Sequence, residues 1–123
     1  MIGVDTSSWI AFLAGEDGED VALVESALAA SQACLPPVVL TELLSDPKLP
    51  KRIEELLLDL PQLEIQAGYW QRAGALRAEV LARRLRARLA DSLIAQSCLD
   101  HDIPLITRDA DFRHFTRRGL KLL

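Results

Sequence analysis

Residues 1–10 read MIGVDTSSWI, a short apolar run that stops on a carboxylate and continues with three hydroxyl side chains. The run Ile2–Val4 is typical of a buried strand. The hydroxyl residues can cap a helix that carries Trp9 and Leu13 at helical spacing. A buried strand followed at once by a helix is typical of an α/β domain, and Asp5 lies at the junction between the two.

The rest of the chain continues this alternation of helices with short apolar strands. We expect helices at 18–31, 37–46, 47–61 and 68–100, a helical turn at 111–115, and short strands at 33–37, 63–66, 103–107 and 119–123. The stretch 68–100 is long enough for two helices that meet near Leu89. The pattern predicts one α/β domain with a mainly parallel sheet over residues 1–123, a length near the commonest domain size.

The composition excludes several classes of protein. Half of the residues are apolar, which is enough for a core without disulfides. Cys34 and Cys98 each lie among apolar residues, so we expect reduced core thiols, and no CxxC zinc motif is present. No apolar run could span a bilayer and no cleavable signal is evident, so we expect a cytoplasmic protein without membrane contact.

Several acidic residues lie near strand ends or helix starts. Asp5 and Asp109 each follow the carboxyl end of an expected strand, where parallel α/β sheets build their sites. Glu42 and Asp91 lie near the start of otherwise apolar helices, and Asp111 follows Asp109 closely. Each acid alone could be a cap, a first-turn acid or a turn residue. Together they predict one acidic pocket.

Carboxylates crowded into a dry cleft raise one another's pKa, and a hard divalent cation relieves this repulsion. We therefore expect one or two Mg²⁺ or Mn²⁺ ions that activate water against a phosphodiester. The expected catalytic acids are Asp5, Glu42, Asp91 and Asp109; the metal ligands are Asp5, Asp91 and Asp109, with Glu42 and Asp111 as weaker candidates. Hydroxyls that could orient these carboxylates, or simply cap helices, are those of Thr6, Ser7, Ser8 and Thr107.

The charge is divided unevenly along the chain. The part up to Tyr69 carries a net charge of −9 and the remainder +5, which together give −4. Arg84 and Arg88 share a face if their segment is helical. We expect these two arginines, with Arg108 beside the last acids, to contact the phosphates of a substrate, which would be RNA phosphates if the family resemblance described next holds. A solvated helix face paired with the acidic half is the alternative for Arg84 and Arg88.

The segments MIGVDTSSWIAFLAGE (1–16), LPPVVLTELL (35–44) and ADSLIAQSCLDHDIPLITRDADF (90–112) resemble the PIN-domain ribonucleases, most closely VapC-type toxins. The resemblance implies a Rossmann-like, mainly parallel sheet of four to five short strands flanked by helices. It also implies Mg²⁺- or Mn²⁺-dependent cleavage of single-stranded or structured RNA, a homodimer, and inhibition by a small antitoxin. The family usually has a Gly-containing break before the third acid, and residues 80–95 contain no glycine, which leaves open a continuous helix or a tight join.

Three alternatives stand beside this reading. A non-toxin PIN nuclease in RNA processing and a catalytically inactive PIN-fold binding module share the fold, although the intact set of acids argues against the second. A phosphatase of the haloacid-dehalogenase kind needs a second acid two residues after Asp5, where Ser7 stands.

The leucines of the expected helix at 47–61 provide more apolar surface than one core-facing stripe needs. These leucines are Leu56, Leu57, Leu58 and Leu60. We expect part of this surface to meet an antitoxin helix or a second copy, with simple core as the alternative, and substitution of Leu57 and Leu60 would distinguish the two.

Overall fold

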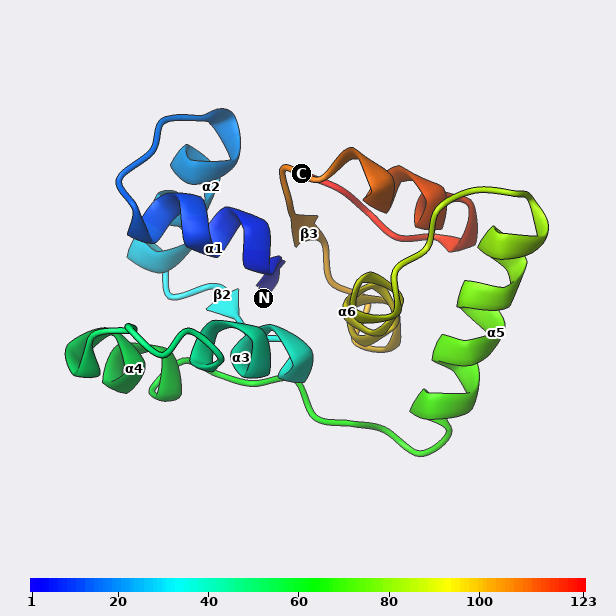
Figure 1. Ribbon diagram of the computed structural model, residues 1–123, viewed down its shortest axis with the longest axis horizontal. Helices are drawn as coiled ribbons and strands as arrows, with labels where there is room; N and C mark the ends of the chain where they lie inside the picture. Colours follow the sequence, from blue (N-terminus) through cyan, green and yellow to red (C-terminus); the bar gives the residue numbers. More distant parts are fainter.

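A parallel sheet in the order β2–β1–β3 lies at the centre of the computed structural model, which describes residues 1–123 (Figure 1). The strands are β1 (Ile2–Val4), β2 (Ala33–Cys34) and β3 (Leu105–Ile106). The chain steps from β1 to one neighbour and later returns to pair on the other side, so the strand order reverses at β1. In open α/β sheets such a reversal places a crevice at the carboxyl end of the central strand.

The expected α/β class with a parallel sheet flanked by helices is confirmed, but only three of the expected four to five strands form. Residues near the other two make single bridges, Leu35 with Gln62 and Leu105 with Leu122. Beyond Leu35 the pairing cannot continue, because Pro36 has no N–H group and the next residue begins a helix. The expected strand at 63–66 is therefore replaced by the single pair at Gln62, and the expected strand at 119–123 forms only the pair at Leu122.

The helices cover both faces of the sheet. In Figure 1, α1 and α2 lie on one side, and α6, backed by α5, lies on the other. The bounds are α1 Thr6–Leu13, α2 Glu19–Ala29, α3 Pro37–Leu44, α4 Lys51–Leu58, α5 Tyr69–Ala82, α6 Leu89–Asp100, and a 3-10 helix, η1, at Ala110–Arg118. No helix combines the length and the apolar character that crossing a membrane requires.

The core lies between the sheet and these helices. Trp9, Phe112 and Phe115 are among its largest fully buried side chains. Both cysteines are free and buried, as expected. Gly3 lets α6 approach the central strand, because a Cβ at residue 3 would lie 2.9 Å from the sulfur of Cys98.

The long helical stretch breaks at residues 83–88, and α6 begins at the expected Leu89. The break needs no glycine: Arg84 itself adopts a left-handed backbone with φ of 60°. Side chains from outside hold the segment in place. Arg77 Nε donates to the carbonyl of Ala87 (2.9 Å), and His114 Nδ1 lies 2.8 Å from the carbonyl of Arg86. These tertiary hydrogen bonds stabilise the break, so the chain can turn here without a glycine.

Candidate active site

Asp5 stands at the carboxyl end of the central strand. Its N–H donates to the carbonyl of Ile106 in β3 (2.9 Å), which fixes it beside the end of the neighbouring strand. Although Asp5 occupies the N-cap position of α1, its carboxylate makes no capping hydrogen bond. Instead Oδ2 accepts hydrogen bonds from Ser7 Oγ (2.7 Å) and Thr107 Oγ1 (2.9 Å). Burial, opposed by these two hydroxyls, raises the pKa of Asp5.

Asp91 brings a second carboxylate to this point from the first turn of α6. Burial raises its pKa to about 6, and the negative charges of Asp5, Asp109 and Glu42 add to the shift, whereas Arg88 opposes it. Such charge effects are strong only over short distances, so these four side chains share one region, which we call the acidic pocket. Asp91 Oδ2 is buried and has no hydrogen-bond partner.

The other two members of the acidic pocket are held by neighbouring hydroxyl and amide groups. Glu42, exposed on α3, accepts a hydrogen bond from Thr6 Oγ1 (2.6 Å). Asp109 is the N-cap of η1: its Oδ1 accepts from the N–H of Asp111 (2.9 Å), and its own N–H donates to Thr107 Oγ1 (3.0 Å). The predicted hydroxyls of Thr6, Ser7 and Thr107 thus all contact carboxylates of the pocket or their backbone.

Asp111 lies outside the acidic pocket. Its carboxylate faces Arg86 at 3.9 Å, and its charge is not among those that shift the pKa of Asp91. Of these two residues, Asp109 is the one whose charge contributes to the pKa shift of Asp91, and both remain candidates for the fourth acid.

The acidic pocket has the chemistry of a divalent-metal site. All its possible ligand atoms are carboxylate oxygens, which Mg²⁺ and Mn²⁺ prefer. Asp91 Oδ2 is buried without a hydrogen-bond partner, and a bound cation would give this oxygen a partner. As the side chains stand, no three of them are gathered closely enough to hold an ion. An ion would have to draw them together.

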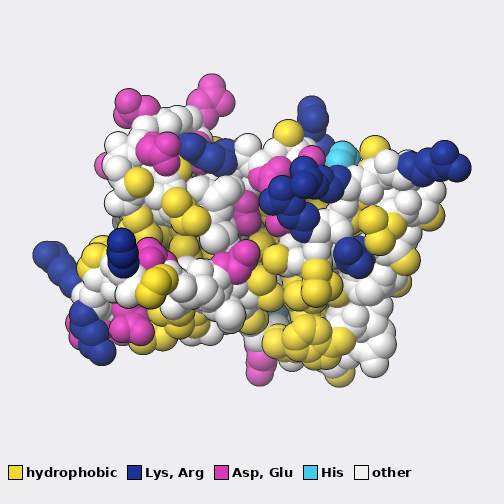
Figure 2. All heavy atoms as spheres, in the orientation of Figure 1, with side chains coloured by type: hydrophobic (Ala, Val, Ile, Leu, Met, Phe, Trp, Pro, Cys, Tyr) yellow, Lys and Arg dark blue, Asp and Glu magenta, His cyan; other side chains and the backbone are white.

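The arginines expected at RNA phosphates lie in different surroundings. Arg88, exposed at the N-cap of α6, is near enough to oppose the pKa shift of Asp91, and Arg84 is exposed at the turn of the linker. Figure 2 shows acidic side chains in the middle of one face, with Lys and Arg side chains beside them between η1 and the start of α6. Arg108 differs, because its guanidinium is bound to Asp20 of α2.

No sequence pattern singles out Asp20. An acid in the first turn of a helix is ordinary, and its partner Arg108 lies 88 residues away. Ser8, a candidate for orienting the pocket acids, donates to Asp20 instead (2.8 Å).

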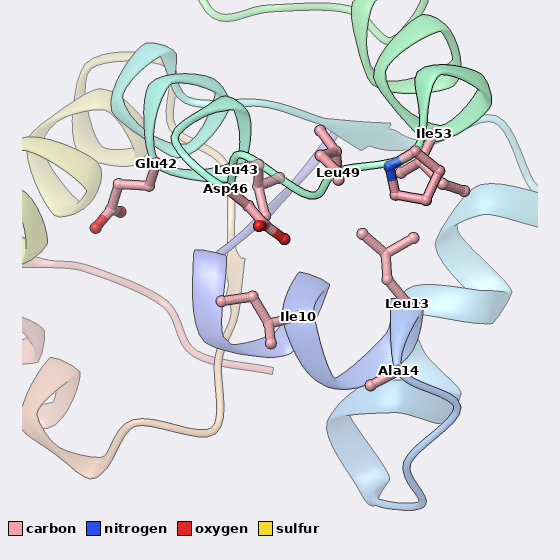
Figure 3. Close-up of a pocket in the computed structure, with 9 residues that line it drawn as sticks. Ile10, Leu13, Ala14, Glu42, Leu43, Asp46, Leu49 and Ile53 are labelled. Carbon is pink, nitrogen blue, oxygen red and sulfur yellow. The ribbon is translucent and has the colours of Figure 1, made fainter.

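An apolar groove opens beside the acidic pocket, between α1 and the α3–α4 segment. It has a volume of about 480 Å³, and Figure 3 shows Leu13 pointing toward Leu49 and Ile53, with Glu42 at one end turned away from them. A second, wholly apolar hollow shares Leu13 and Ile53 and extends to Leu56 and Leu60. We treat the two as one apolar groove.

The four leucines of α4 and the residues after it are partly core and partly exposed. Leu57 is 2% exposed and belongs to the core, so the alternative reading holds for it. The exposed leucines are its neighbours Leu56 and Leu58, at 55% and 50%. Leu60 is partly buried and lines the apolar groove.

Comparison with solved structures finds the same fold in several complexes. The chain superposes on a chain of VapBC2 from Rickettsia felis bound to a promoter DNA fragment, with a TM-score of 0.73 and 21% identity, covering 100% of this chain and 98% of that one. FitAcB from Neisseria gonorrhoeae gives 0.72 and 17%, covering 100% and 96%. DNA-bound VapBC from Salmonella typhimurium gives 0.71 and 20%, covering 99% and 96%.

No curated protein sequence matches the chain. The family model of the PIN domain matches residues 2–118, a range that contains every strand end and helix start of the acidic pocket. The chain therefore belongs to the PIN domain family.

Proposed function

We propose that this protein is a metal-dependent endoribonuclease and the toxin of a VapBC-type toxin–antitoxin pair. Members of its family are generally nucleases. The observation that carries the proposal is the buried, unpartnered Oδ2 of Asp91 in the field of Asp5, Asp109 and Glu42. Three acids around such a carboxylate oxygen are unfavourable without a cation, so their presence supports a metal-binding role.

Each member of the acidic pocket has a distinct task in this proposal. One or two Mg²⁺ or Mn²⁺ ions, when bound, would supply an activated water and neutralise charge on a phosphodiester. Asp5, Asp91 and Asp109 would hold the ion, with Glu42 at the exposed edge. Ser7 and Thr107 fix the carboxylate of Asp5 through their hydroxyls.

The basic side chains beside the acidic pocket suit an RNA backbone. Arg84 and Arg88 are exposed and have no carboxylate partner within salt-bridge distance, so they are free to meet phosphates. Arg108 is engaged by Asp20, which makes it a weaker candidate for that contact.

The proposed partners are a small antitoxin and a second copy of this chain in a cytoplasmic complex. Two structural neighbours, from Rickettsia felis and Salmonella typhimurium, are VapBC assemblies bound to DNA, which supports an antitoxin partner by analogy of fold. The apolar groove is the surface of this chain best suited to an apolar helix of such a partner.

Cleavage of single-stranded RNA by the purified chain tests the activity. We expect cleavage with Mn²⁺ or Mg²⁺, none after chelation, and a loss of at least about 100-fold in Asp5→Ala, because that variant removes the central ligand. The matched control is Glu25→Ala, an exposed acid on α2, which should cleave like the wild type.

The outcomes separate the alternatives. Undiminished cleavage by Asp5→Ala would overturn the proposed site. Absence of cleavage with any metal, in a folded protein that still binds RNA, would favour an inactive binding module. Cleavage without growth arrest on expression would favour a PIN nuclease of RNA processing over a toxin.

A further inference from the structure

Arg108 and Asp20 form a two-pronged ion pair between distant parts of the chain. Arg108 Nε donates to Asp20 Oδ2 (2.9 Å) and Nη2 donates to Oδ1 (3.1 Å). The side chain of Asp20 is 11% exposed, and Ser8, which is fully buried, donates to the same Oδ2. A fork-shaped pair of this kind fixes direction as well as distance.

The loop between α1 and α2 is shaped around this pair. Gly18, with φ of +155°, precedes α2, and a Cβ there would lie 2.6 Å from Asp20 Oδ1 and 3.1 Å from Arg108 Nη2. Glu16 adds a longer charge contact to Arg108 at 3.9 Å. Only glycine at residue 18 leaves room for the pair.

The pair acts on the connection between β3 and η1, which carries two groups of the acidic pocket. Arg108 lies between Thr107, whose hydroxyl donates to Asp5, and Asp109, whose N–H donates to that same hydroxyl. The guanidinium of Arg108 therefore anchors to α2 the segment that orients Asp5 and presents Asp109.

We propose that Arg108 and Asp20 are positioning residues that hold Thr107 and Asp109 against Asp5, rather than residues that contact RNA. The effect on metal binding rests on the proposed function, whereas the ordering of the segment does not. This assignment replaces the sequence-based expectation of a phosphate contact for Arg108.

The chain contains a matched control for this pair. Arg72 Nε and Nη2 donate to Asp100 Oδ1 (2.9 Å) and Oδ2 (2.7 Å), with the Asp100 side chain 7% exposed. This second fork joins α5 to the end of α6 and contacts no member of the acidic pocket. The Arg72–Asp100 pair therefore has the same two-bond geometry and similar burial as the Arg108–Asp20 pair, but it lies away from the acidic pocket.

The test compares Arg108→Gln and Asp20→Asn with Arg72→Gln and Asp100→Asn. Amide hydrogen exchange in the metal-free protein should speed up at Asp109 and Asp111 in the first two variants only. Calorimetric titration with Mn²⁺ alone should show about 10-fold weaker binding in the same two, the size expected when a partner of a metal ligand is lost. Thermal unfolding should show similar losses of stability in all four.

Arg108→Lys keeps the charge but not the fork, and should recover only part of the Mn²⁺ affinity. It also serves if Arg108→Gln fails to fold. Equal exchange and equal affinity in both pairs of variants would overturn the proposal. If the wild type binds no Mn²⁺, the proposed metal function fails, and the exchange data still decide whether the pair orders the segment.

Discussion

Asp91 is a carboxylate in a place that disfavours its charge. Burial and three neighbouring acids raise its pKa to about 6, from an ordinary value of 3.8. Between these two values the folded protein holds a proton that the unfolded chain has released. The stability of the metal-free protein therefore falls as the pH rises through this window.

Asp91→Asn should remove this penalty in the metal-free protein. We expect the variant to be about 2 kcal/mol more stable than the wild type at pH 7, after allowance for solvent screening, with the gap closing toward pH 4. Urea unfolding at a series of pH values in the presence of chelator measures it. A gap that widens toward low pH would contradict the sign, and Glu25→Gln, on the exposed face of α2, should show no gap.

At the scale of single residues, the gathering of the acids and of their hydroxyl partners could be predicted from the sequence. Asp5 and Asp109 could be predicted because strand ends are visible in sequence. The pairing of Asp20 with Arg108 could not be predicted, because it joins residues 88 positions apart and depends on the direction of both side chains. No local pattern encodes such a contact.

At the scale of elements, β1 leaves little room for a side chain at Gly3. A Cβ at Gly3 would lie 2.9 Å from Cys98 Sγ in the densely packed contact between sheet and α6. Gly3→Ala should destabilise the fold by about 1–3 kcal/mol, the usual cost of overpacking. In the double variant with Cys98→Ala the cost should be smaller than the sum of the two single changes, because the obstructing sulfur is gone.

Gly74→Ala is the control for this experiment. Nothing lies within 4 Å of a Cβ at that position in α5, and alanine favours the helix by up to about 1 kcal/mol. Chemical denaturation should therefore move in opposite directions for the two glycine substitutions. Destabilisation by both to the same extent would contradict the steric explanation for Gly3.

The linker between α5 and α6 contains a residue in a costly conformation. Arg84 has φ of 60°, and its side chain is exposed. Its effect on the stability of the fold therefore comes from the backbone conformation alone. Arg84→Gly should raise the free energy of unfolding by up to about 1 kcal/mol, whereas Arg84→Lys should leave it unchanged. If Arg84 also contacts RNA, only the glycine variant should weaken RNA binding at low salt, as a fluorescence titration would show.

The elements themselves were largely predictable, including a join near Leu89, but the contacts that form their interruptions were not. The α5–α6 break lacks a glycine and depends on hydrogen bonds from Arg77 and His114, which sequence periodicity does not reveal. The segment 63–66 has the alternation of a strand, yet Pro36 leaves its partner with one residue to pair. In both cases a tertiary contact overrides a local pattern.

For the whole molecule, the reversal of strand order at β1 brings together chemistry from both ends of the chain. Asp5 comes from the net acidic first part of the chain, and Asp91 and Asp109 come from the net basic second part. Both parts therefore contribute acids to one site at the carboxyl end of the central strand. Glu42 belongs to the acidic pocket and also lines one end of the apolar groove. A partner seated in the groove would therefore lie beside the acidic pocket.

Substitutions in the apolar groove should separate partner binding from folding. Ile10 and Leu56 line it and are 56% and 55% exposed, so Ile10→Glu and Leu56→Glu should leave the thermal midpoint within a few degrees of the wild type. The partner to test is a small protein encoded by a neighbouring reading frame, co-expressed with this chain. Each substitution should weaken its binding by at least about 10-fold, as calorimetry would measure, because a charge would enter an apolar contact. Leu81→Glu, 45% exposed on α5, is the matched control and should bind normally. Leu57→Glu should unfold the protein, because that leucine is core. Equal binding by the groove variants and the α5 control would place the partner elsewhere on the molecule.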